Sequence, residues 1–157
     1  MCLCNDTQSD TVDLVDRWQK QVFAYTTDAI TDAVPKHNHC NSADDSKVLI
    51  ALMDADRVAN LDVDLFIRSG QNFHADPAVD YKLWLSGPEA TYKKPRSVLR
   101  DIAYSLEWAD PTNTKVGVRT KLGKQWAAER ATVFRTFFAH LQQQLEQEGI
   151  LPYPFDQ

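Results

Sequence analysis

The chain has 157 residues, 43% hydrophobic and 25% charged, which is typical of one soluble globular domain with a sizeable core. Its net charge of −5 argues against a general nucleic-acid binder, and no apolar run reaches the length of a membrane span, so no membrane contact is expected. Three cysteines without framework spacing, and an N-terminus without a signal-peptide pattern, indicate a cytoplasmic protein.

The first part of the chain is expected to hold two helices. Residues 1–9 form a flexible arm, and residues 10–34 form a helical N-terminal extension whose apolar positions recur at helical spacing up to Pro35. Ser42 and Asp45 have the spacing of a loose capping box, which predicts a second helix over about 43–57.

Two strands are predicted next. Apolar residues stand at every second position from Leu61 to Ile67, which is the period of a half-buried strand. Residues 79–85 form the second strand, and the short linker between the two predicts a long hairpin.

A helix, a strand and a long helix complete the prediction. Ser97 caps a helix that runs to about residue 108, residues 115–120 form a third strand, and the last helix covers about 123–148. The order α-α-β-β-α-β-α gives an α+β fold, a small antiparallel sheet with helices packed on it. We expect a single domain over 1–157, with an α/β core at 42–149 and an extended tail at 150–157.

Charge is divided unevenly along the chain. Residues 1–81 carry 14 Asp and six Lys or Arg, whereas residues 82–135 carry 11 Lys or Arg and five acidic residues. If the fold gathers the basic stretch on one face, that face offers a surface for DNA or for an acidic protein partner.

The second predicted helix contains the most informative stretch, Leu49-Ile50-Ala51-Leu52-Met53-Asp54-Ala55-Asp56-Arg57. Ala51 and Ala55 lie four residues apart, so they share a helix face that a partner helix can approach closely. Asp54 and Asp56 stand at the C-terminal end of the helix, where the helix dipole disfavours negative charge. A bound cation would explain carboxylates at that position, and Mg²⁺ prefers such oxygen ligands.

This stretch resembles the signature of the LAGLIDADG homing endonucleases. The resemblance implies a Mg²⁺-dependent double-strand DNA endonuclease with Asp56 as the main metal ligand and Asp54 behind it. Because the chain has one motif, it implies a homodimer whose motif helices pack together through Leu49, Ala51, Leu52 and Ala55.

In that family, strands after the motif form a saddle in the DNA major groove. The residues that would contact DNA here are Arg68, Tyr81, Lys82, Trp84, Lys93, Lys94 and Lys124. Lys121 and Gln125 would assist catalysis, since residues 121–125 resemble a basic, Gln-containing segment found late in the family. The sequence departs from the family at Arg57, where the motif has a glycine that turns the chain into the first strand.

Three other interpretations remain open. Asp62, Asp64, Asp80 and Lys82 on the predicted hairpin have the residue types of a PD-(D/E)xK nuclease, which would also hold Mg²⁺. His37, His39 and Cys40 offer imidazole and thiolate ligands for a transition metal, without a fourth ligand at a recognisable spacing. Finally, the chain suits a non-catalytic protein-binding or regulatory protein, whose basic stretch docks an acidic partner.

Overall fold

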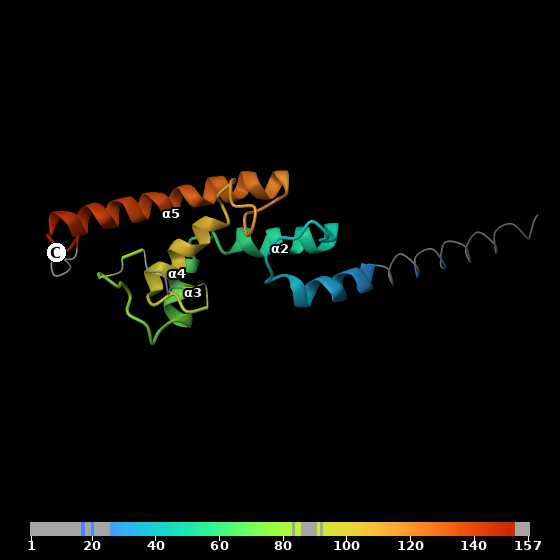
Figure 1. Ribbon diagram of the computed structural model, residues 1–157, viewed down its shortest axis with the longest axis horizontal. Helices are drawn as coiled ribbons and strands as arrows, with labels where there is room; N and C mark the ends of the chain where they lie inside the picture. The colour runs from blue at the N-terminus through green and yellow to red at the C-terminus, as the bar shows by residue number, and fades with distance from the viewer. Residues whose placement is uncertain are drawn as a thin grey trace, which may run out of the picture.

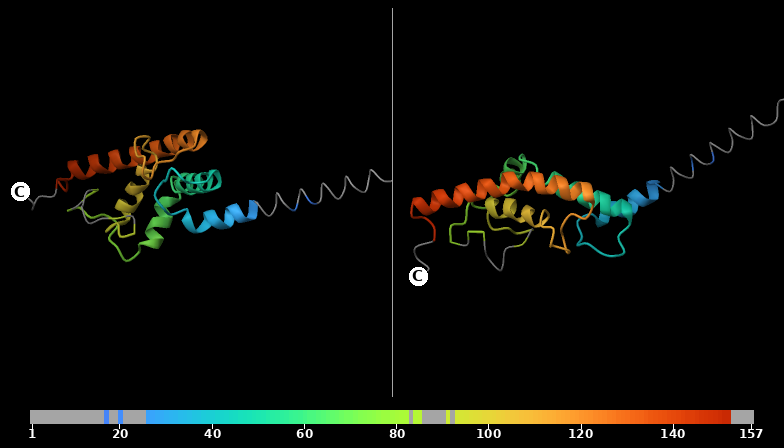
Figure 2. Two further views of the ribbon diagram at one scale, coloured as in Figure 1. Left: turned by 45° about the vertical axis from the view of Figure 1, so that its right-hand side comes forward. Right: turned by 90° about the horizontal axis from the view of Figure 1, so that it is seen from above.

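The computed structural model describes residues 17, 20, 26–82, 84–85, 91 and 93–152. The described residues are mostly helical. Helical residues 26–33 lead into the 3-10 turn η1 (Val34–Lys36), followed by α2 (Lys47–Ala59), α3 (Leu65–Asn72), α4 (Val98–Tyr104), the 3-10 turn η2 (Ser105–Glu107) and α5 (Lys121–Gln147). Figure 1 shows α5 running along one side of the folded part, with α2 and α4 next to it and α3 on the far side of α4, and the left view of Figure 2 agrees.

Two apolar clusters join α5 to the shorter helices. Ala127 and Ala131 near its middle pack with Val58, Leu61, Trp108 and Val118. Further along, Phe134 and Phe138 pack with Leu65 of α3 and with Leu99 and Ile102 of α4. A third cluster joins α2 to the N-terminal helical residues through Ala33, Leu49 and Met53. Helix α5 therefore packs with residues of α2, α3 and α4, while the N-terminal helical residues pack on α2.

The predicted α+β fold is wrong. The described residues contain no sheet, and their only extended pairing is an isolated bridge between Thr91 and Lys94. None of the helices in the described part of the chain is both long and apolar enough to cross a membrane.

The second half of the first predicted strand is the start of helix α3 and its first half is a turn, because the apolar pattern fits two periods. Leu61 and Leu65 are buried, with 1% and 8% of their surface exposed, whereas Val63 and Ile67 are 61% and 67% exposed. Ser69 continues the buried series, so burial recurs every four residues, as on a helix face. Alternating apolar residues had indicated a period of two, but only half of them face the core.

The other two predicted strands are turns in the residues that the structure describes. Asp80 accepts the Lys82 backbone N–H through its side chain (3.2 Å) and the Trp84 N–H through its carbonyl (2.7 Å). Asn113 in turn accepts the N–H groups of Lys115 and Val116 through its side chain, both at 3.1 Å. Such local bonds occupy the backbone groups that a strand ladder would need.

The helix predictions agree better with the structure. Ser97 caps α4 by accepting the Arg100 N–H at 3.1 Å, and Gly149 follows α5 with a φ of +70°, a conformation that glycine adopts without strain. The cap of α2 differs from the expected one. Ser46 caps this helix, while Ser42 and Asp45 bond to each other in the loop before it.

Candidate functional site

Asp54 of the motif helix is an anchor for the start of α5. It is buried, with 3% of its surface exposed. Its carboxylate accepts the backbone N–H of Thr120, the N-cap of α5, at 2.6 Å and that of Arg119 at 3.1 Å from each oxygen. These donors take up the acceptor positions that a metal ion would require, so the predicted metal role of Asp54 gains no support from its surroundings.

The junction around Asp54 is closely packed at Gly123. A Cβ placed on Gly123 would lie 2.6 Å from Val118 Cγ1 and 2.7 Å from Thr120 Oγ1. Arg119, which donates its N–H to Asp54, also pairs with Asp45 at 2.7 Å. We name Asp45, Asp54, Arg119, Thr120 and Gly123 the α2–α5 junction.

Arg57 holds the loop before α2 in place. Its buried guanidinium donates to Asn41 Oδ1 (2.6 Å), to the His39 carbonyl (3.2 Å) and to the Gly117 carbonyl (3.4 Å). Desolvation lowers the pKa of this arginine, and the neighbouring Arg119 adds to the effect. Where the LAGLIDADG motif has a glycine for a sharp turn, this chain therefore has a side chain that joins the loop before α2 to the loop before α5.

Asp56, the predicted main metal ligand, is half-buried. Its Oδ1 lies 3.4 Å from Asn60 Nδ2, and the residue lines a cavity of about 300 Å³ together with His37, His39 and Cys40. The cavity thus brings the predicted transition-metal ligands near Asp56. Even so, the described residues form no group of three His, Cys, Asp or Glu side chains with a geometry that could hold a metal ion.

The predicted dimer residues of α2 point in different directions. Leu49 is buried and Leu52 half-buried in the cluster around Met53, while Ala51 and Ala55 are exposed. The two alanines line a groove of about 390 Å³ with Leu122 and Trp126 of α5. A second copy of the chain on this face stays a prediction.

The residues predicted to contact DNA or to assist catalysis are distributed over α3, α5 and the loops between α3 and α4. Exposed on the first turns of α5 are Lys121, Lys124 and Gln125, the last of which donates to Glu129 at 3.1 Å. Tyr81 and Lys82 are exposed in a turn, Lys93 and Lys94 are exposed in the following loop, and Trp84 packs against the core. The sheet face that was expected to align several of them is absent from the described residues.

The acidic residues of the PD-(D/E)xK interpretation have separate partners. Asp62 pairs with Arg130 at 2.7 Å, Asp64 pairs with Arg68 at 2.9 Å, and Asp80 bonds within its own turn next to Lys82. The hairpin that would bring these carboxylates to one face is not formed by the described residues.

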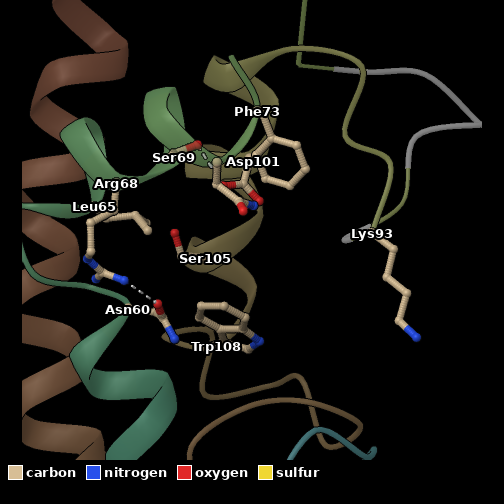
Figure 3. Close-up of a pocket in the computed structure, with 10 residues that line it drawn as sticks. Asn60, Leu65, Arg68, Ser69, Phe73, Lys93, Asp101, Ser105 and Trp108 are labelled. Atoms are coloured by element: carbon tan, nitrogen blue, oxygen red, sulfur yellow. Dashed lines mark hydrogen bonds between the residues drawn. The ribbon is translucent and has the colours of Figure 1, made fainter. Parts of the chain in front are cut away.

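A larger cavity, of about 530 Å³, lies between α3 and the α4–η2 segment. We name it the α3–α4 cavity. Figure 3 shows Ser69, Asp101 and Phe73 at one end and Trp108 at the other, with Arg68 and Asn60 on one side and Lys93 opposite. It is lined by Asn60, Leu65, Arg68, Ser69, Asn72, Phe73, Lys93, Asp101, Ser105 and Trp108. Aromatic walls with a few convergent polar groups are typical of small-molecule sites.

Asp101 is the unusual group in this cavity. It is 9% exposed, and the hydrogen bond recorded for its carboxylate comes from Ser69 Oγ at 2.7 Å. Desolvation raises the pKa of Asp101, and the Ser69 hydroxyl offsets part of that effect. Buried carboxylates in proteins are normally paired, so a carboxylate with one neutral donor in a cavity wall is a candidate functional group.

Sequence reasoning missed Asp101, although a signal for it was present. Four residues at helical spacing, Ser97, Asp101, Ser105 and Trp108, are all buried on one face of the α4–η2 segment. Three of the four are polar, and a polar series on the inward face of a helix indicates hydrogen bonding or a site rather than plain packing.

Comparison with protein-family models, with curated proteins and with solved structures finds no match for this chain.

Proposed function

We propose that this protein is a non-catalytic, regulatory binding protein whose α3–α4 cavity takes a small polar ligand. The observation that carries the proposal is Asp101, a carboxylate that is nine-tenths buried in the wall of a cavity of about 530 Å³ and accepts a hydrogen bond from one hydroxyl. Leaving a carboxylate so poorly satisfied costs folding free energy, and proteins retain such groups where a ligand or a reaction uses them.

The size and lining of the cavity support a small molecule as the ligand. A volume of about 530 Å³ lies within the range of small-molecule sites. Phe73 and Trp108 offer apolar surface, while Asn72, Ser105 and Asp101 offer polar atoms that would orient the ligand. We place the protein in the cytoplasm, as its cysteine content predicts.

The DNA endonuclease interpretation has less support from the geometry. It depended on a saddle of strands, which is absent from the described residues, and on Asp56 as the main metal ligand with Asp54 behind it. Asp54 already accepts backbone N–H groups. Binding of DNA, binding of an acidic protein and formation of a homodimer stay predictions from the sequence.

A fragment screen by NMR on the ¹⁵N-labelled full chain tests the proposal. We expect some fragments to shift the amide signals of α3, α4 and η2. Asn72→Phe at the exposed rim should fill the cavity mouth and abolish these shifts. Gln71→Phe is the matched control, because Gln71 is exposed beside it without lining the cavity. A screen without any such fragment, or shifts that persist in Asn72→Phe, would contradict the proposal.

A further inference from the structure

The carboxylate of Asp101 lacks a positively charged partner. Its contacts in the described residues are the Ser69 hydroxyl and the desolvating wall of the cavity, and no ion pair with it is present there. A buried carboxylate is far more stable beside a cation that also satisfies its free lone pairs. A cation placed at this end of the cavity would therefore stabilise the charged form of Asp101.

The two cations of the cavity do not supply it. Arg68 donates to Asp64 (2.9 Å) and to Asn60 (3.2 Å), and it also bonds the carbonyl of Ala59 at 3.3 Å. Figure 3 shows its guanidinium directed to Asn60, and the Lys93 ammonium directed away from Asp101. Arg68 bonds to other groups and Lys93 points away, so neither cation forms an ion pair with Asp101.

A metal ion is a poor candidate for this position. Mg²⁺ and Ca²⁺ bind carboxylates together with carbonyl and water oxygens, whereas the described residues that line the cavity include one carboxylate and no group of three His, Cys, Asp or Glu side chains that could hold a metal ion. Asp101 lies instead beside the Phe73 ring and the Ser69 hydroxyl, with Ser105 further along the cavity and the Trp108 ring at its other end. Aromatic faces attract organic cations, and hydroxyl oxygens accept N–H bonds from an ammonium group.

We propose that the ligand of the α3–α4 cavity is a small organic amine, whose ammonium group forms an ion pair with Asp101 beside the Phe73 ring. This inference rests on the proposed function and names its ligand class. The ammonium N–H groups donate to the carboxylate oxygen that Ser69 leaves open, and the carbon skeleton of the amine fills the apolar part of the cavity.

The ionisation of Asp101 gives this ligand class a pH signature. Burial raises the pKa of the carboxyl in the free protein, and an adjacent ammonium favours its charged form. Amine binding should therefore strengthen as pH rises through the raised pKa of Asp101. It should weaken again when the amine itself loses its proton.

The test uses benzylamine as the probe, with benzyl alcohol and benzoate as isosteric neutral and anionic controls. Binding to the full-length chain is measured by NMR titration at neutral pH. We expect benzylamine to shift the amide signals around Asp101 and the two controls to bind at least about tenfold more weakly. Equal binding of the three probes, or no binding of benzylamine, would overturn the inference.

Three variants separate the ion pair from general packing. Asp101→Asn should weaken benzylamine at least about tenfold, since it removes the charge and keeps the shape. Asp101→Glu keeps the charge and should retain binding, while Asp44→Asn, on an exposed loop, should leave it unchanged. Unchanged affinity in Asp101→Asn would overturn the inference.

The outcomes also separate this inference from the proposed function. If neutral or anionic fragments bind in the cavity and amines do not, the ligand class is wrong and the binding function stands. If no compound binds in the cavity, both are wrong.

Discussion

Two buried aspartates of this protein lie in contrasting environments. Asp54 in the α2–α5 junction accepts the N–H groups of Arg119 and Thr120 from the backbone. Asp101 in the α3–α4 cavity has the hydroxyl of Ser69. A carboxylate surrounded by fixed backbone donors stabilises a fold, because the donors are in place before any ligand arrives. One that is left with a single neutral donor costs stability and is available for binding.

Asp54 and Asp101 each line a cavity, but close packing at Gly123 distinguishes the junction. Gly123 sits in the junction with side-chain atoms closer than a Cβ would tolerate. The region around Asp101 is open to a cavity of about 530 Å³. Substitutions in the junction should therefore cost stability, while those at Asp101 should cost binding.

The largest expected effect is at Asp54. Asp54→Asn replaces one acceptor oxygen by an NH₂ group that would face the backbone N–H donors of Arg119 or Thr120. We expect a loss of about 2–4 kcal/mol in the free energy of unfolding, measured by urea denaturation. Asp56→Asn is the matched control, since Asp56 is half-buried on the same helix. A loss of stability no larger than that of the control would contradict the structural role assigned to Asp54.

Gly123→Ala tests the packing of the same junction. The added methyl group would meet Val118 and Thr120 at under 3 Å. We expect a loss of about 1–3 kcal/mol despite the better helix propensity of alanine. Gly70→Ala in α3 has nothing within 4 Å of the new Cβ and should gain about 0.5–1 kcal/mol. Similar changes in both variants would show that the junction has room.

Asp101→Asn should act in the opposite direction from Asp54→Asn. Burial raises the pKa of Asp101 above 3.8, so the folded state holds this proton more tightly than the unfolded state. Stability due to Asp101 therefore falls as pH rises from 3.8 through the raised pKa. The asparagine variant lacks this loss. We expect its free energy of unfolding, measured by urea denaturation, to equal or exceed that of the parent chain at neutral pH, and any gain to disappear below pH 3.8. A variant destabilised at neutral pH would contradict the comparison.

Substitution of Asp45 should have the smallest effect on stability, and the contribution of Asp45 to stability should depend on pH in the opposite sense to that of Asp101. A backbone hydrogen bond from Ser42, together with Arg119, lowers the pKa of Asp45 below 3.8 despite partial desolvation. Its contribution to stability is present above pH 3.8 and is lost as pH falls through the lowered pKa. Asp45→Asn should thus be less stable than the parent at neutral pH and should approach it in acid, as followed by thermal unfolding. A stability difference between Asp45→Asn and the parent chain that grows as pH falls would contradict this assignment.

Much of the helical part could be predicted from the sequence, since caps and apolar spacing are local signals. Ser97 and Gly149 mark helix ends in the structure as expected. The sheet was wrong because Leu61 and Leu65 fit both a period of two and a period of four, and only tertiary burial decides between them. The turn bonds of Asp80 and Asn113 compete with strand formation and give no periodic pattern.

The candidate site was harder to predict for a different reason. The resemblance of residues 49–57 to the LAGLIDADG signature predicted functional carboxylates at Asp54 and Asp56. Asp101 is unusual because its recorded hydrogen-bond donor is the hydroxyl of Ser69, which lies on another helix. The residue order along α4 indicates that Asp101 faces inward, but it does not show whether a positively charged side chain lies beside the carboxylate.

A ¹³C NMR titration of the Asp101 side-chain carboxyl, in the full chain with and without benzylamine, tests the central claim most directly. Asp101 should titrate above its ordinary pKa of 3.8 in the free protein and at lower pH when the amine is present. An Asp101 carboxyl that titrates at or below 3.8 and does not respond to the amine would contradict the account.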